Sequence, residues 1–155
     1  SDITLDKQQV NLSIMLAQIS YEFMPLYREK NLECVNEIED NLIVSIDINQ
    51  FERVFDNLIR NAINYSDKDS KINISAKKEN DHIIIKLSNS VNFVDKNKLN
   101  HIFEPFVRLD ESRSSKTGGS GLGLAITKKI IELHHGTIRA DLNNKLIIFT
   151  VKLPL

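Results

Sequence analysis

The chain has 155 residues, 41% of them hydrophobic and 26% charged, and its formal net charge is -1. These values are typical of one globular domain with its own core, and the lack of a long block of like charge excludes a general binder of nucleic acid or membrane surfaces. The single cysteine, Cys34, excludes an internal disulfide and a cysteine-based metal site, so we interpret it as a small core residue. No apolar run approaches the ~20 residues of a membrane span, and no signal peptide is visible. Because the chain also begins without methionine, we expect a soluble, monomeric piece of a longer protein.

Hydrophobic periodicity predicts helices and strands in alternating groups along the chain. Helices are predicted over 11–28, from 49 onward, over 96–103 and over 122–134, with Asn11 as the first N-cap and Gly136 as the last C-terminal stop. Strands are predicted over 32–38, 42–48, 72–77, 82–88, 137–142 and 146–153. Residues 108–120 are polar, carry almost no core residues and are expected to form a mobile loop. This order predicts an α/β two-layer sandwich, with helices on one face of a mixed β-sheet.

Four of the five glycines lie directly before the last predicted helix, at Gly118, Gly119, Gly121 and Gly123. Glycine permits positive φ and close approach of a ligand, and a helix start offers unpaired N–H groups at the positive end of its dipole. This combination predicts a phosphate site, although a hinge without a ligand is the alternative. A P-loop is excluded because Leu124 follows Gly123 where a lysine is required.

The polar stretch before these glycines differs from a Rossmann loop, which would follow a buried strand directly. It supplies three cations that could close over phosphates, and so we expect it to act as a lid. These cations are Arg108, Arg113 and Lys116.

Three asparagines share one stripe of the second predicted helix. Asn57, Asn61 and Asn64 stand at i, i+4 and i+7, beside the apolar stripe. Asparagine is a mediocre helix former, so the stripe indicates either buried hydrogen bonding or a polar wall of a pocket. Amide oxygens suit Mg²⁺, which usually shares phosphate ligands. With the glycine loop, the stripe favours a Mg-nucleotide site.

Three motifs of the chain resemble those of the sensor histidine kinases. "NLIRNAINYS" is similar to their N box, "IFEPFVRLDESRS" to their F box and "TGGSGLGLAITKKIIELHHG" to their second glycine box. The similarity runs in order from about Asn11 to Pro154. It implies the Bergerat ATP-binding fold, which gyrase, Hsp90 and MutL-type ATPases share. The stretch "FVRLDESRSSKTGGSGLGLAI" most resembles the vancomycin-resistance kinases of the VanS type.

The resemblance also implies roles for particular residues. Asn61 would coordinate Mg²⁺, with Asn57 one turn earlier on the same wall. Arg108 and Arg113 would reach the phosphates from the lid, whose base Phe103 and Phe106 would anchor. The nucleotide would contact Asn57, Asn61, Asn64, Tyr65, Asn89, Lys116, Gly119, Gly121, Leu122, Gly123 and Leu124.

The sequence departs from the family pattern at two nucleotide-binding positions. In "NSVNF", Asn89 replaces the aspartate that would bind the adenine amino group, and Val91 and Phe93 replace two glycines. Asn64 stands where the family often has a phosphate-binding lysine. These changes indicate weak ATP affinity and imperfect selection of adenine.

No histidine of the chain has the sequence context of the family's phosphoacceptor. We expect His134 and His135, at a helix end, to be surface residues that complement the helix dipole. The chain therefore resembles the catalytic domain alone, with residues 1–10 as a residual linker from a missing dimerisation domain.

The implied function is that of a protein-histidine kinase module, inactive alone, in a two-component system. It would present the γ-phosphate of ATP to a histidine on a separate dimerisation domain. The full membrane sensor would then phosphorylate a response regulator on the cytoplasmic side. Two alternatives stay open. A gyrase-like hydrolase would need a glutamate where Asn57 stands, and a degenerate module would hold nucleotide weakly or not at all.

Overall fold

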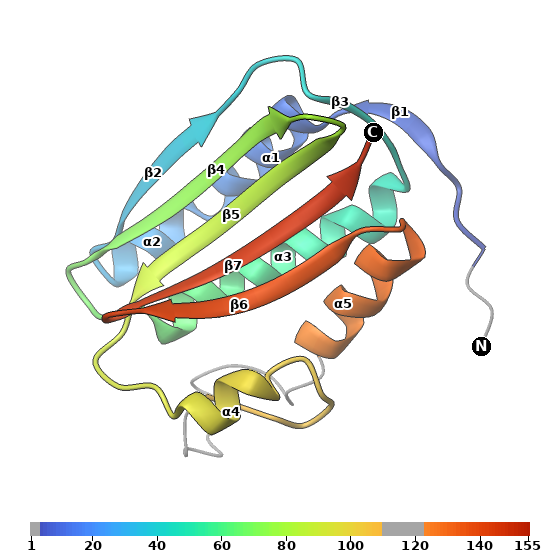
Figure 1. The fold of residues 1–155 in the computed structure, drawn as a ribbon. Coiled ribbons are helices and arrows are strands. Elements are labelled where there is room, and N and C mark those ends of the chain that lie inside the picture. The colour runs from blue at the N-terminus through green and yellow to red at the C-terminus, as the bar shows by residue number, and fades with distance from the viewer. Residues whose placement is uncertain (1–3, 110–122) are drawn as a thin grey trace.

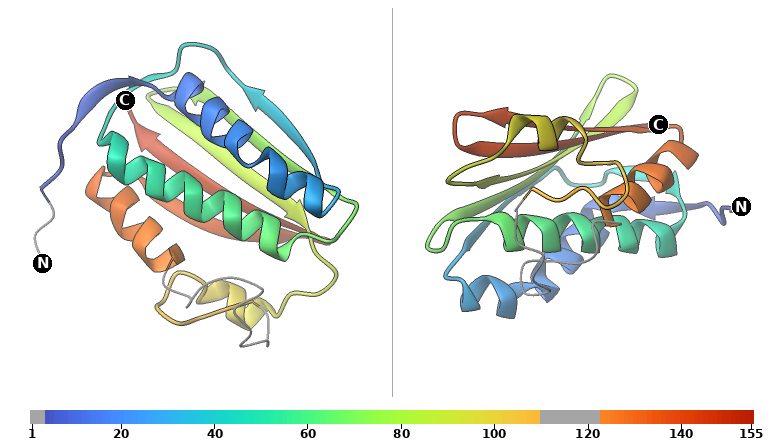
Figure 2. Two further views of the ribbon diagram at one scale, coloured as in Figure 1. Left: turned by 180° about the vertical axis from the view of Figure 1, so that it is seen from behind. Right: turned by 90° about the horizontal axis from the view of Figure 1, so that it is seen from below.

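The computed structural model describes residues 4–109 and 123–155, and its architecture is a sheet with helices on one face (Figures 1 and 2). The main sheet has the strand order β2-β4-β5-β7-β6; β2 and β4 are parallel and the other neighbours antiparallel. Its strands are β2 (Glu33–Ile38), β4 (Lys71–Glu79), β5 (His82–Ser90), β6 (Thr137–Asn143) and β7 (Leu146–Pro154). The predicted mixed sheet and two-layer sandwich are confirmed.

A second, two-stranded sheet joins the start of the chain to the domain. β1 (Gln8–Asn11) pairs antiparallel with β3 (Ile43–Ile46), and Gln8 stands opposite Ile46. Gln8 to Val10, the last residues of the expected linker over 1–10, belong to this sheet. Their short, polar sequence carries no strand periodicity, so the pairing depends on a partner strand more than 30 residues away.

The first predicted helix divides into α1 (Leu12–Glu22) and α2 (Met24–Glu29). The Asn11 N-cap is confirmed, since its side chain accepts a hydrogen bond from the Ile14 amide. A single helix over 11–28 is wrong, and Pro25 is the physical reason. Proline cannot donate to the preceding turn, and its ring clashes with that turn's carbonyl, but it is tolerated in the first turn of a new helix.

Helix α3 (Ile48–Tyr65) packs on one face of the sheet and supplies much of the core. Asp47 caps it by accepting from the Gln50 amide at 3.1 Å. The apolar stripe predicted from the sequence is buried, as its residues Phe51, Val54, Phe55, Leu58 and Ala62 are at most 2% exposed. Helix α4 (Lys96–Asn100) is shorter than the predicted 96–103. Cys34, expected in the core, is half-buried and packs against the core from its margin.

Helix α5 (Gly123–Leu133) ends in a turn that corrects our expectation for His134, whereas His135 is exposed as expected. His134 is buried rather than at the surface, and it bridges two helices. Its Nε2 accepts from the Asp47 amide at 3.0 Å, and its Nδ1 lies 2.8 Å from the Ile130 carbonyl. His134 therefore joins the end of α5 to the start of α3.

The left-handed residue of this turn is His135, with φ 63, rather than Gly136. The Gly136 amide donates to the Ile131 carbonyl at 2.9 Å and so closes the helix as expected. Glycine is required for a different reason, because a Cβ there would lie 2.6 Å from the Lys152 carbonyl oxygen.

Candidate functional site

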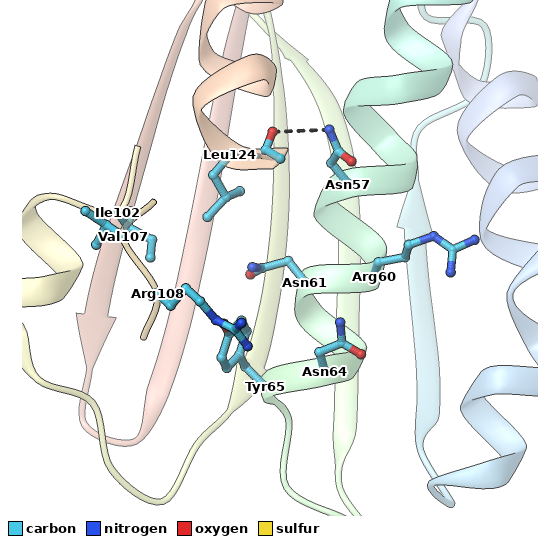
Figure 3. A pocket seen from close by; sticks show the side chains of 10 residues that line it. Asn57, Arg60, Asn61, Asn64, Tyr65, Ile102, Val107, Arg108 and Leu124 are labelled. Atoms are coloured by element: carbon cyan, nitrogen blue, oxygen red, sulfur yellow. Dashed lines mark hydrogen bonds between the residues drawn. The ribbon is translucent and has the colours of Figure 1, made fainter. Parts of the chain in front are cut away.

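A pocket of about 210 Å³ opens between the C-terminal half of α3, the start of α5 and the segment after α4 (Figure 3). The segment after α4 supplies part of its apolar lining, and α3 supplies most of its polar lining. The pocket is lined by Asn57, Arg60, Asn61, Asn64, Tyr65, Ile102, Val107, Arg108, Gly123 and Leu124. All ten residues lie within the three motifs identified in the sequence, and Arg60 belongs to the N-box stretch.

The asparagine stripe forms one wall of this pocket. Because the neighbouring face of α3 is packed into the core, helical geometry turns Asn57, Asn61 and Asn64 to the rim, where all are half-buried. Tyr65 follows them at the last turn. These four residues line one pocket together with Gly123 and Leu124, and their contacts with a nucleotide remain predictions.

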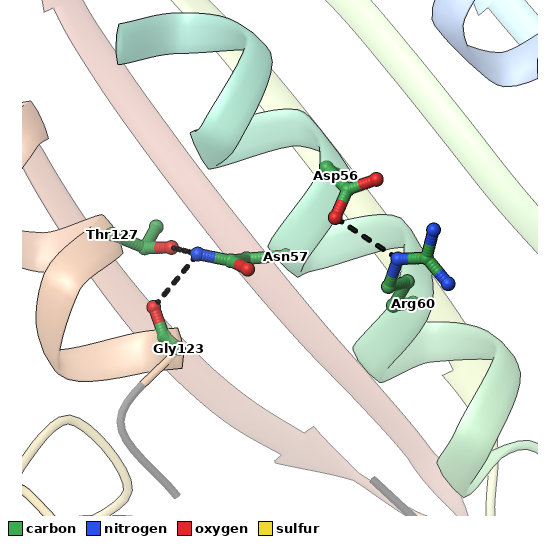
Figure 4. Close-up of polar contacts among 5 residues, drawn as sticks. All are labelled: Asp56, Asn57, Arg60, Gly123 and Thr127. Carbon is green, nitrogen blue, oxygen red and sulfur yellow. Dashed lines mark hydrogen bonds and ion pairs between the residues drawn. The ribbon is translucent and has the colours of Figure 1, made fainter. Parts of the chain in front are cut away.

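Asn57 is held by helix α5 (Figure 4). Its Nδ2 donates to the Gly123 carbonyl oxygen at 3.1 Å and to Thr127 Oγ1 at 3.3 Å. The amide oxygen points away from these two bonds. Asn57 therefore links the start of α5 to α3 through its Nδ2, and its Oδ1 is directed away from α5.

Arg60 belongs to the rim of the pocket, but its guanidinium group is engaged elsewhere. It pairs with Asp56 at 3.0 Å and lies over the Phe23 ring at 5.1 Å from the centroid. Figure 3 shows it turned away from Asn61 and Asn64. Arg108, by contrast, lines the pocket from the segment after α4.

Of the two phenylalanines expected to anchor the lid, Phe103 is packed against the domain and Phe106 is exposed. Phe103 packs edge-on against Phe149 with ring centroids 6.0 Å apart, and Lys128 Nζ lies 5.8 Å from its centroid. Phe106 is 72% exposed and has φ 69, so the expectation that it packs as an anchor is wrong. The buried apolar residues on either side of Phe106 in the chain are Ile102 and Leu109.

Asn89 lies near the end of β5 and is only 1% exposed. Its Nδ2 donates to the Ser90 carbonyl oxygen at 3.4 Å, and its backbone is paired with Ile72 and Ile147 on the two neighbouring strands. It is not among the residues that line the 210 Å³ pocket. Its proposed contact with the base remains a prediction.

Lys30 is a positioning residue that the sequence patterns did not indicate. Its Nζ donates to the carbonyl oxygens of Ile63 and Asn64 at 2.7 and 3.1 Å, and it thereby caps the end of α3 beside the pocket. Burial lowers its pKa, and the charge of Asp67 opposes that shift. No local signal marks this lysine, because its partners are more than 30 residues away in sequence.

Gly123 begins α5 without a positive φ, so its glycine is not required by backbone conformation. An added Cβ would lie 3.5 Å from the Asn57 side chain, an ordinary contact. Five further predicted site residues lie outside the described residues: Arg113, Lys116, Gly119, Gly121 and Leu122.

Residues 4–109 and 123–155 lack both a metal-binding cluster of His, Cys, Asp or Glu and a membrane-spanning helix. Within these ranges no group of three or more His, Cys, Asp or Glu residues could hold a metal ion. The helices of the same ranges include none that is long and apolar enough for a membrane crossing. The described pocket is lined by the side-chain amides of Asn57, Asn61 and Asn64.

Comparison with known proteins agrees with this geometry. The family described as histidine kinase-, DNA gyrase B- and HSP90-like ATPase matches residues 46–155, so the chain belongs to that family. Sensor protein VanSC of Enterococcus gallinarum and sensor protein VanS of Enterococcus faecium are each 43% identical over 152 residues, or 98% of this chain. These residues cover 42% and 39% of the two proteins, so the chain spans less than half of their length.

Among known structures, the catalytic domain of histidine kinase ThkA is similar over 97% of this chain and 96% of its own, with a TM-score of 0.85 and 26% identity. A complex of ThkA with response regulator protein TrrA contains the same fold, with a TM-score of 0.79 and 25% identity over 96% of this chain and 41% of that one. The expected Bergerat fold, the resemblance to sensor histidine kinases and the likeness to the VanS type are confirmed.

Proposed function

We propose that this chain is the ATP-binding catalytic domain of a two-component sensor histidine kinase and presents the γ-phosphate of ATP to a histidine on a separate dimerisation domain. The observation that carries the proposal is the wall formed by Asn57, Asn61 and Asn64 across from the start of α5. The wall offers amide oxygens and the helix start offers N–H groups. Together they suit a nucleotide that carries a metal ion and phosphates.

The described wall fits Mg²⁺ in chemistry, because its amide oxygens are hard, neutral ligands. Asn61 would hold the ion, while Asn57 and Asn64 stand one turn before and after it on the same side of α3. When bound, Mg²⁺ neutralises charge on the phosphates. Arg108 would add a second positive charge from the opposite side of the pocket, with Arg113 and Lys116 following in the lid.

Transfer to an imidazole needs little proton chemistry from this domain. The attacking nitrogen already carries a lone pair; its bond to phosphorus forms as the bond from phosphorus to the bridging oxygen of ADP breaks. Catalysis then depends on positioning and charge neutralisation. Hydrolysis, by contrast, needs a base for water, and the Asn57 amide cannot accept a proton.

Three further features of the proposal concern the whole kinase. The phosphoacceptor would lie on the dimerisation domain, a response regulator would receive the phosphate from it, and the catalytic domain would lie on the cytoplasmic side of a membrane sensor. The named VanS-type relatives and the ThkA complex with a response regulator support this arrangement. The isolated domain would be a soluble monomer.

The decisive experiment mixes this domain with the dimerisation domain of its own kinase and ATP labelled on the γ-phosphate. We expect label on a histidine of the added domain, and the label should depend on Mg²⁺. A degenerate module is favoured instead if calorimetry detects no binding of ATP in the presence of Mg²⁺. Phosphate release by the catalytic domain alone would favour a hydrolase.

A further inference from the structure

Thr127 is a fully buried polar residue that touches the candidate site without lining it. It lies on α5 one turn after Gly123, and its side chain is 0% exposed. Its Oγ1 accepts from Asn57 Nδ2 at 3.3 Å, while the Gly123 carbonyl oxygen accepts from the same nitrogen at 3.1 Å (Figure 4). One asparagine amide thus bonds to two successive turns of α5.

The chemistry of these partners fixes which end of the amide faces α5. A backbone carbonyl can only accept, so the nitrogen of Asn57 must face Gly123. A primary amide carries two N–H groups, and Gly123 and Thr127 provide one acceptor for each. The Asn57 oxygen is therefore directed away from α5, as Figure 4 shows.

We propose that Thr127 is a positioning residue, which holds the Asn57 amide so that the nucleotide pocket meets its oxygen and not its N–H groups. This inference rests on the proposed function. An oxygen in that place attracts hydrated Mg²⁺ and repels the oxygens of a phosphate. An N–H group would do the reverse, so the orientation of one amide decides how strongly the pocket distinguishes Mg-ATP from metal-free ATP.

Valine is the appropriate substitution, because it keeps the branched shape of threonine and removes the acceptor. In Thr127→Val, one N–H of the half-buried Asn57 loses its partner. That N–H can regain a hydrogen bond if the amide turns toward the pocket. Thr127→Ser restores the hydroxyl group with a smaller side chain. Ile130→Val, at a buried position of the same helix, removes core packing without a polar contact to Asn57.

The experiment measures ATP binding by calorimetry, with and without Mg²⁺, in the unaltered 155-residue chain and these three variants. We expect Mg²⁺ to tighten binding to the unaltered chain and Thr127→Val to reduce that gain about two- to tenfold, the range of one hydrogen bond. Metal-free binding should be unchanged or tighter. Thr127→Ser and Ile130→Val should keep the gain, and Thr127→Val should have no further effect in a chain that also carries Asn57→Ala.

Nuclear magnetic resonance of the Asn57 side-chain amide provides a readout that does not depend on nucleotide. Both of its protons should exchange slowly with water in the unaltered chain, and one should exchange faster in Thr127→Val but not in Ile130→Val. Equal exchange and an equal Mg²⁺ gain in Thr127→Val would overturn the inference. If the unaltered chain binds no ATP, the proposed function fails, while the amide exchange still decides whether Thr127 holds Asn57.

Discussion

At the scale of single residues, the pocket depends on polar side chains that share one face of α3 and on contacts from other elements that orient these side chains. Asn57 shows both. Its place on the stripe follows from helical spacing, but the direction of its amide is set by Gly123 and Thr127, which are more than 60 residues further along the chain. Asn61 and Asn64 share the stripe, and we expect the three residues to differ in function.

Asn61→Ala should weaken the binding of Mg-ATP far more than that of metal-free ATP. The substitution removes the oxygen proposed to hold the ion, whereas other contacts to the nucleotide remain. Calorimetry with and without Mg²⁺ measures the difference, and Asn143→Ala, an exposed asparagine in β6, is the matched control. Equal losses in the two titrations would remove Asn61 from the metal role.

Asn89→Asp should tighten ATP binding by a few-fold to about tenfold and sharpen its preference over GTP. Hydrogen bonds to charged groups are worth roughly 1.5–3 kcal/mol, against roughly 0.5–1.5 kcal/mol for neutral ones. Because the side chain is buried and its N–H contacts the Ser90 carbonyl, the same substitution should destabilise the nucleotide-free chain. Weaker ATP binding by the variant would show that the base is recognised elsewhere.

At the scale of elements, the position of α5 relative to α3 is the main determinant of the pocket. Asn57 bonds to the first turns of α5, and His134 bonds the other end of α5 to the Asp47 amide at the start of α3. Asp47 in turn accepts from the Asp6 amide at 2.9 Å, and that bond lowers its pKa. Two separate polar contacts thus hold the two helices together at opposite ends.

The His134 contact predicts how stability depends on pH. Burial lowers the pKa of His134 below its ordinary value of 6.5, more than its bond to the Ile130 carbonyl raises it. The unfolded chain therefore binds a proton at a higher pH than the folded chain does. The free energy of unfolding should be largest above pH 6.5 and fall as the pH is lowered below that value.

Urea unfolding at pH 7.5 and at pH 5.5 measures this dependence. His134→Gln should lose part of the difference between the two values, because glutamine does not titrate. His135→Gln is the matched control at the next, exposed position and should keep it. The explanation fails if the two variants retain the same pH dependence.

Of the two described glycines, Gly136 should tolerate an added methyl group poorly and Gly123 should tolerate it well. Gly136→Ala places a Cβ 2.6 Å from the Lys152 carbonyl oxygen, so the end of α5 must move from β7, at a cost of about 1–3 kcal/mol. Gly123→Ala makes only ordinary contacts at 3.5 Å and should leave the free energy of unfolding nearly unchanged. Urea unfolding compares the two variants, and an equal loss in both would contradict the close contact at Gly136.

At the scale of the whole molecule, the pocket lies at one end of the helical layer that covers the sheet. The sheet supports α3 from behind, and α3 carries the asparagine wall while α5 and the segment after α4 close the sides. His134 is not accessible as a phosphoacceptor, because it is buried and bonded on both nitrogens.

We therefore expect the isolated chain to neither phosphorylate itself nor turn over ATP appreciably. The expected result of incubation with labelled ATP is an unlabelled protein and no steady release of phosphate. Addition of the dimerisation domain should restore labelling, on the added protein only. Stable label on His135, or phosphate release abolished by Asn57→Ala, would contradict the expectation that the isolated chain neither phosphorylates itself nor hydrolyses ATP.

Local sequence determined most of the elements and the identity of the polar wall, because helix periodicity and glycine clusters act over a few residues. The buried stripe of α3, the Asn11 cap and the grouping of Asn57, Asn61, Asn64 and Tyr65 all follow from spacing alone. The family motifs added the fold. The same reasoning overlooked the break at Pro25 because an apolar helical pattern continued across it.

Tertiary structure alone decided the features that join segments far apart in the chain. The pairing of β1 with β3, the cap that Lys30 places on α3, the burial of His134 and the orientation of Asn57 by Thr127 each connect residues separated by about 30 to 90 positions. No local pattern can specify such contacts, since a hydrogen bond between distant residues depends on where the whole core brings them. The sequence by itself therefore determined which residues form the pocket wall, and the packing of α5 on α3 decided which atoms that wall presents.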